Sequence, residues 1–173
     1  HRRENIGMPM ENIFSAVREI VEEFEDVTVV YPIHKNPKVR EIASKYLAGH
    51  ERIEIIEPLD VFDFHNFAAK SHIILTDSGG VQEEAPSLQK PVLVLRDTTE
   101  RPEGVEAGTL KLAGVQKEHI YELTKELLTD DALYRQMAEA SNPYGDGKAS
   151  LRICENIKYY YGIRKDKPES FNV

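Results

Sequence analysis

The sequence predicts an α/β fold, a Rossmann-like doubly wound parallel sheet with additional helices at its end. Five short apolar runs are separated by segments whose apolar residues recur at helical spacing. Alternating strands and helices are typical of a parallel sheet covered on both faces. The 173 residues suit one domain. We therefore expect a single domain over residues 1–163, followed by a polar tail over 164–173.

The first half of the chain predicts two helices and two strands in alternation. Residues 9–24 carry apolar side chains at helical spacing, and the β-branched run VTVVY at 27–31 predicts a buried strand. A second helical pattern covers residues 39–47. The run IEII at 53–56 predicts the second strand.

The second half continues the alternation and then becomes helical. A short helix is expected to open after the strand that ends at Thr76. Cys154 falls in the apolar pattern of the last helix, so we expect it to pack in the core. The predicted strands are 72–76, 91–95 and 108–114, and the predicted helices are 60–70, 117–128, 130–140 and 149–161.

Composition and charge exclude several classes of function. A formal net charge of -8 argues against wrapping of DNA or RNA, which requires a basic surface. The single cysteine rules out a disulfide within the chain, and the histidines show no metal-ligand spacing, so neither metal nor cofactor is expected. No apolar run approaches the roughly 20 residues of a membrane span, and no signal peptide is visible. We expect a cytoplasmic protein that does not bind membranes.

The strongest local motif is TDSGGVQEE, which follows a predicted strand and opens a helix. Ligands of parallel sheets bind beyond the carboxyl ends of the strands. Gly79 and Gly80 would let a phosphate approach the main chain closely, and Ser78 can either cap the helix or donate to a phosphate oxygen. Glu83 and Glu84 would repel phosphate but suit hydroxyl groups such as those of ribose. An ordinary strand-to-helix turn explains the spacing equally well.

A second motif, RDTTERPEG, follows the strand predicted at 91–95. Arg101 would lie at the same edge of the sheet as Ser78, and its guanidinium matches a phosphate. The alternative is a solvated loop in which Glu100 and Glu103 are the partners of Arg101. Taken alone, the motif favours that alternative.

Three further segments gain meaning only in combination. The opening HRREN concentrates positive charge at Arg2 and Arg3, which a simple basic terminus would also explain. His34 lies in a loop after a strand, where a lone histidine is ordinarily just exposed. The turn-rich NPYGDG at 142–147 is either a hinge or a simple loop.

Taken together, the motifs resemble those of the non-hydrolysing UDP-N-acetylglucosamine 2-epimerases. HRREN, IHKNP, LTDSGGVQEEAPSLQKPVLVLRDTTERPE and NPYGDGKAS occur in that order, and the resemblance covers almost the whole chain. It implies the second domain of a GT-B type fold, in which two Rossmann-like domains face a cleft. The chain would be the carboxy-terminal, UDP-binding half, starting just after the first strand of that domain. We therefore expect an incomplete sheet and no activity without the amino-terminal domain.

The resemblance also implies an activity. The family interconverts UDP-N-acetylglucosamine and UDP-N-acetylmannosamine by eliminating UDP to give 2-acetamidoglucal and then adding UDP back. The product would serve cell-envelope polysaccharide synthesis, and the complete protein would be a homodimer. Two alternatives remain open: a hydrolysing epimerase or GT-B glycosyltransferase domain, and a UDP-binding module without catalysis.

Site residues carried over from the family fall on the motifs above. The resemblance makes His1 catalytic and places it near the diphosphate. Arg2 and His34 correspond to a neighbouring regulatory site for UDP-N-acetylglucosamine. The UDP contacts implied are Phe64 for uracil, Ser78, Gly79 and Gly80 for phosphate, Glu84 for ribose and Arg101 for the diphosphate.

Overall fold

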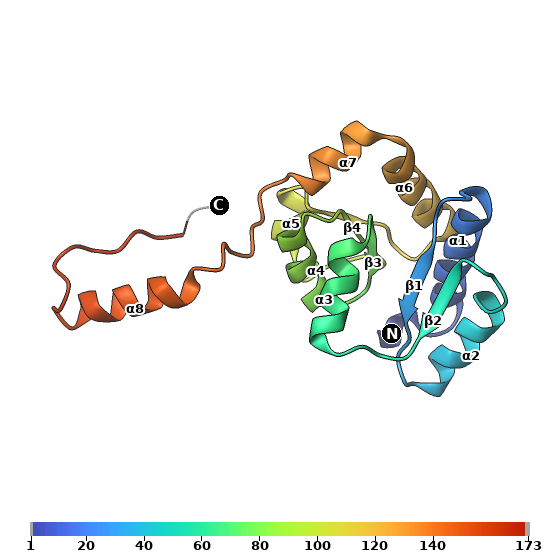
Figure 1. Ribbon diagram of the computed structural model, residues 1–173, viewed down its shortest axis with the longest axis horizontal. Helices are drawn as coiled ribbons and strands as arrows, with labels where there is room; N and C mark the ends of the chain where they lie inside the picture. The colour runs from blue at the N-terminus through green and yellow to red at the C-terminus, as the bar shows by residue number, and fades with distance from the viewer. Residues whose placement is uncertain (1, 172–173) are drawn as a thin grey trace.

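Short parallel strands alternate with helices along the chain, as Figure 1 shows. The computed structural model describes residues 2–171. Every predicted strand is found, each within a few residues of its expected limits. The strands are β1 (Val29–Pro32), β2 (Ile53–Ile56), β3 (Ile74–Thr76), β4 (Val92–Val94) and β5 (Leu110–Leu112).

The predicted helices are also confirmed, and several begin at side-chain caps. Asn36 accepts from the Lys38 N–H and Asp60 accepts from the Asp63 N–H, which satisfies main-chain donors that the helix itself leaves free. The helices are α1 (Met8–Glu23), α2 (Pro37–Tyr46), α3 (Val61–Lys70), α4 (Gly79–Glu84), α6 (Lys117–Thr129), α7 (Asp131–Ala138) and α8 (Ala149–Tyr160). Three short elements were not predicted: η1 (Arg3–Asn5), η2 (Ala85–Leu88) and α5 (Pro102–Glu106).

The strands form two separate parallel sheets. β1 pairs with β2, and β4 lies between β3 and β5. Within residues 2–171 no ladder of hydrogen bonds joins β1 to β3. In the strand order 3-2-1-4-5-6 of doubly wound folds, the first strand lies between the second and the fourth. With β1 and β2 counted as second and third strands, the break falls at that central place, as expected for an incomplete sheet.

Both faces of the sheets are covered. Leu93 of β4 faces a large core with α1 and α6, whereas Val92 and Val94 face a smaller cluster that includes Ala85 and Tyr144. Successive strand residues point to opposite faces, so one short strand contributes to both cores. All three β4 residues are fully buried. The carboxyl ends of β3 and β4 are thereby fixed by packing on both sides.

The last helix stands apart from this body. In Figure 1, α8 extends away from the remaining elements, and none of its residues is buried. The prediction that Cys154 packs in the core is wrong, because its side chain is exposed. The apolar spacing of α8 is real, but the surface that it would cover is not among the described residues. Residues 164–171 run back along α8, where Arg164 pairs with Glu155 at 2.7 Å.

No helix within residues 2–171 combines the length and the apolar character needed to cross a membrane.

Candidate functional site

The glycine motif connects the end of β3 to α4. The Ser78 N–H donates to Thr76 Oγ1 at 3.0 Å, and Ser78 occupies the N-cap position, although its hydroxyl makes no capping hydrogen bond there. A Cβ at Gly79 would lie 2.6 Å from Glu100 Oε1. A Cβ at Gly80 would have no atom nearer than Glu84 Oε1 at 3.8 Å. A side chain at Gly79 would therefore require the Glu100 carboxylate to move, while Gly80 is exposed and has room beside its main chain.

Arg101 lies beside this motif, at the start of α5. Its Nε donates to Glu83 in a short contact, and its Nη1 donates to the main-chain oxygen of Glu100 at 3.1 Å. The hydrogen bond to Glu83 raises the pKa of the guanidinium further. The expectation that the carboxylates of Glu100 and Glu103 are its partners in a solvated loop is wrong. Arg101 instead pairs with Glu83 of α4, the helix that begins at the glycine motif.

The HRREN segment is hydrogen-bonded to residues at the ends of β3 and β4. The Arg2 main-chain N–H donates to Asp77 Oδ2 at 2.9 Å, and its side chain reaches the Asp77 main-chain oxygen and Glu100 Oε1 at 3.3 and 3.1 Å. Asn5 Nδ2 donates to both Asp77 Oδ2 and the Leu95 main-chain oxygen at 3.1 Å. The side chain of Asn5 therefore links the end of β3 to the residue that follows β4.

The carboxylate of Asp77 is held in its charged form despite its burial. Burial is the largest influence and would raise its pKa, but hydrogen bonds from Arg2 and Asn5, together with the charged amino terminus of the 173-residue chain, leave the pKa below its ordinary value. Burial also raises the pKa of Tyr31 in β1 to about 12, with a further contribution from the charge of Asp77. The ends of β1 and β3 are therefore close enough to interact electrostatically.

α3 is joined to the end of the glycine motif through a contact between His65 and Glu84. His65, the residue after Phe64, has its Nε2 3.1 Å from Glu84 Oε2. The rings of Phe64 and His65 are 6.1 Å apart between centroids, and Phe64 is half-buried. A ligand that contacts both Phe64 and Glu84 would span the junction between α3 and α4.

The remaining candidates lie at the same edge or outside the described residues. His34 follows β1, is exposed, and accepts the Asn36 N–H on its Nδ1 at 3.1 Å. Arg2 lies at the end of β3, so both regulatory candidates occupy strand ends. His1 lies outside the described residues, and its predicted catalytic role stays a prediction.

Sequence reasoning gave no role to several residues that shape this site. Asn5, Asp77, Gln82, Thr99 and Glu100 stand inside the quoted motifs, but none of them was predicted to be functional. Helical spacing could have identified Gln82, because it lies four residues after Ser78 and so faces the same side of α4. For Asn5, Asp77 and Glu100, partners 72 to 98 residues away decide the role, and for Thr99 the partner Gln82 lies 17 residues away.

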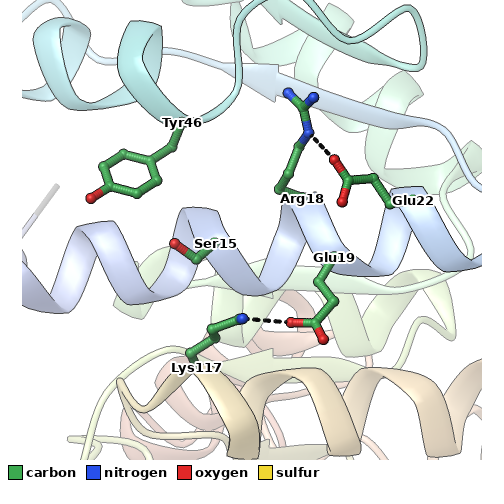
Figure 2. Close-up of a pocket in the computed structure, with 6 residues that line it drawn as sticks. All are labelled: Ser15, Arg18, Glu19, Glu22, Tyr46 and Lys117. Atoms are coloured by element: carbon green, nitrogen blue, oxygen red, sulfur yellow. Dashed lines mark hydrogen bonds and ion pairs between the residues drawn. The ribbon is translucent and has the colours of Figure 1, made fainter.

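A surface pocket elsewhere on the molecule does not compete with this site. It has a volume of about 330 Å³ and lies along α1, with Tyr46 and Lys117 contributed by other elements (Figure 2). Its charges are satisfied locally: Arg18 pairs with Glu22 at 2.6 Å and Lys117 pairs with Glu19 at 2.7 Å. The pocket therefore offers no unmatched charge to a ligand and lies away from the carboxyl ends of the strands.

Parallel strands covered on both faces, with polar loops gathered at their carboxyl ends, define a Rossmann-like α/β domain whose loops lie where such folds bind ligands. A family model described as UDP-N-acetylglucosamine 2-epimerase matches residues 1–158. The chain belongs to this family. It is 70% identical over 171 residues to the UDP-N-acetylglucosamine 2-epimerase of Bacillus subtilis (strain 168), covering 99% of this chain and 45% of that protein.

Solved structures agree with this assignment. The S. aureus MnaA–UDP co-structure is 66% identical, with a TM-score of 0.93 over 99% of this chain and 47% of that chain. The Neisseria meningitidis UDP-GlcNAc 2-epimerase bound to UDP-GlcNAc is 47% identical, with a TM-score of 0.86 over 91% and 42% of the two chains. The predicted fold class, one domain of a GT-B type fold, is confirmed. The chain spans slightly less than half the length of these relatives.

Proposed function

We propose that this chain is the UDP-binding half of a non-hydrolysing UDP-N-acetylglucosamine 2-epimerase. The complete protein interconverts UDP-N-acetylglucosamine and UDP-N-acetylmannosamine by eliminating and re-adding UDP through 2-acetamidoglucal. One observation carries the proposal: a relative that is 66% identical over nearly the whole chain has been solved with UDP. The Neisseria meningitidis relative, bound to UDP-GlcNAc, supports the same class of ligand.

The arrangement at the strand ends suits each part of UDP. Phe64 and the α3–α4 junction take uracil, Glu84 takes the ribose hydroxyls, and the main chain at Gly80 receives a phosphate. Because Gly80 is exposed and has no near neighbour, phosphate oxygens can reach the main-chain N–H groups there. Ser78 and Gly79 complete the phosphate contacts in this proposal.

Arg101 supplies the positive charge that the chemistry requires. When the bond from the sugar to UDP breaks, negative charge develops on the leaving diphosphate, and donors held in place beforehand stabilise it. Arg101 is held by Glu83 at the edge of the same motif. The proton at carbon 2 requires a carboxylate base, which we assign mainly to the amino-terminal domain, with His1 assisting.

Three further assignments accompany the proposal. Arg2 and His34 form part of a regulatory site for UDP-N-acetylglucosamine, completed by the other domain. The complete protein is a homodimer in the cytoplasm. Its product enters cell-envelope polysaccharide synthesis.

Two measurements on the complete protein test the function. Calorimetric titration should show binding of UDP and not of ADP, since the uracil contacts select the base. Proton NMR of a reaction with UDP-N-acetylglucosamine should show UDP-N-acetylmannosamine appearing without net release of UDP. Release of free N-acetylmannosamine together with UDP would identify a hydrolysing epimerase instead. UDP binding without any turnover would identify a non-catalytic module.

A further inference from the structure

Gln82 is a polar residue with no exposed surface in the middle of the candidate site. Its side chain is 0% exposed, and it is the only glutamine among the buried residues described. Burial of an amide is costly unless its donors and acceptors are paired. An apolar residue of similar size would fill the same space without that requirement. The partners of Gln82 therefore indicate what the amide does.

The two ends of the Gln82 amide bind two different loops. Its Nε2 donates to the main-chain oxygen of Ser78 at 3.2 Å. Its Oε1 accepts the Thr99 hydroxyl at 2.5 Å. Ser78 follows β3, and Thr99 belongs to the loop that follows β4, so the amide bridges the loops after neighbouring strands.

Thr99 extends the bridge to Arg101. The Thr99 hydroxyl donates its proton to Gln82 and accepts the Arg101 main-chain N–H at 3.0 Å. A continuous chain of hydrogen bonds thus runs from Ser78 through Gln82 and Thr99 to Arg101. Its ends are the two residues proposed to contact the diphosphate from opposite loops.

We infer that Gln82 is a positioning residue that fixes the distance between the phosphate loop and Arg101. This inference rests on the proposed function, because it presumes that UDP binds between these loops. Gln82 itself is buried beneath the loops and is not a ligand contact. Its contribution is to hold two donors in place before the diphosphate arrives, which lowers the cost of ordering them on binding.

Gln82→Met tests the inference in the complete protein, since methionine keeps the length of the side chain and removes both hydrogen bonds. We expect UDP affinity to fall about tenfold by calorimetry, the loss expected when a pair of hydrogen bonds no longer orders the site. Uridine lacks the diphosphate, so its affinity, measured by ligand-observed NMR, should stay within about twofold of wild type. A merely structural role would reduce both affinities together or neither.

Thr99 provides a matched pair of variants on a half-buried residue that does not depend on Gln82→Met folding. Thr99→Val removes the hydroxyl and should weaken UDP binding about tenfold, whereas Thr99→Ser keeps the hydroxyl and should restore the affinity of wild type. The Gln82→Met/Arg101→Ala double variant should lose less affinity than the two single losses multiplied, because Gln82 acts partly through Arg101.

The outcomes separate this inference from the proposed function. Wild-type protein that fails to bind UDP overturns the proposed function and the inference with it. Wild-type protein that binds UDP, together with folded Gln82→Met and Thr99→Val proteins of unchanged UDP affinity, overturns the inference alone. Equal loss of UDP and uridine affinity also overturns it, since it would show general damage to the fold.

Discussion

Gly79 and Gly80 are neighbours in sequence but meet different constraints in the fold. A side chain at Gly79 would displace the Glu100 carboxylate, whereas Gly80 has ordinary contact distances around it. Gly80 also lies inside a helix, where alanine is favoured over glycine. The packing of the described residues therefore does not require glycine at position 80, which makes Gly80 the place to test the proposed phosphate contact.

Gly80→Ala should keep the fold and impair the site. We expect the free energy of unfolding to stay the same or rise by up to about 1 kcal/mol, because alanine stabilises a helix relative to glycine. UDP affinity should fall, since the added methyl group blocks approach of phosphate to the main chain. Urea denaturation and UDP titration of the same protein measure both effects. Normal UDP binding by the folded variant would contradict the assignment of this loop to phosphate.

Arg101→Ala should weaken UDP binding by about 1–3 kcal/mol, the range for a hydrogen bond to a charged group. Arg18 offers a matched control at the distant pocket of Figure 2. Its side chain is 33% exposed and paired with Glu22, while Arg101 is 31% exposed and paired with Glu83. Arg18→Ala should leave UDP affinity unchanged in calorimetric titration. If Arg101→Ala and Arg18→Ala bind UDP with equal affinity, Arg101 is an ordinary surface residue and does not contact the diphosphate.

At the scale of elements, η1 is connected to the sheet by polar contacts rather than by a strand. Asn5 and Asp77 join η1 to the ends of β3 and β4, and Asn5 is only 2% exposed. The sequence could not predict this junction, because it depends on residues 72 and 90 positions apart. The strands themselves were predictable, since β-branched runs such as VTVVY identify buried strands locally.

The junction at Asp77 predicts a dependence of stability on pH. Because its pKa is lower in the folded chain than the ordinary value of about 3.9, Asp77 stabilises the fold above that pH. The contribution is lost as pH falls through the lower, folded-state pKa. Asp77→Asn should therefore be less stable than wild type at pH 7, and the difference should shrink below about pH 4.

Urea denaturation at pH 7, 5 and 3 measures this difference. Asp26→Asn is a suitable control, because Asp26 is exposed at a turn after α1. The difference in the free energy of unfolding between wild type and Asp26→Asn should stay constant from pH 7 to pH 3. A constant difference between wild type and Asp77→Asn down to pH 3 would show that the charge of Asp77 does not stabilise the junction.

The short helix α5 shows where local patterns stop being informative. PEGVE is too short for an apolar period, so the segment from Arg96 was expected to be a loop throughout. Gly104 fits there because Leu110 and Tyr144 pack against its main chain, leaving no room for a Cβ. That packing depends on β5 and on the NPYGDG segment, which local sequence cannot bring together.

At the scale of the whole molecule, two features stand out: the break between the two sheets and the detached helix α8. Among the described residues, β1 and β3 share no hydrogen-bonded ladder, and no residue of α8 is buried. Helical periodicity predicted α8 and its apolar face, but periodicity identifies a buried face without identifying the partner, which is why the expectation for Cys154 was wrong.

A pair of isoleucines tests whether α8 stands apart in solution. Ile120 in α6 is 1% exposed, and Ile157 in α8 is 52% exposed. Ile120→Ala in the 173-residue chain should lower the free energy of unfolding by about 2–5 kcal/mol, because it leaves a cavity in the core. Ile157→Ala should change it by less than about 0.5 kcal/mol, because that side chain is exposed and its removal leaves no cavity in the core. Comparable losses in urea denaturation would mean that α8 folds back onto the body, and its apolar face would then belong to this domain.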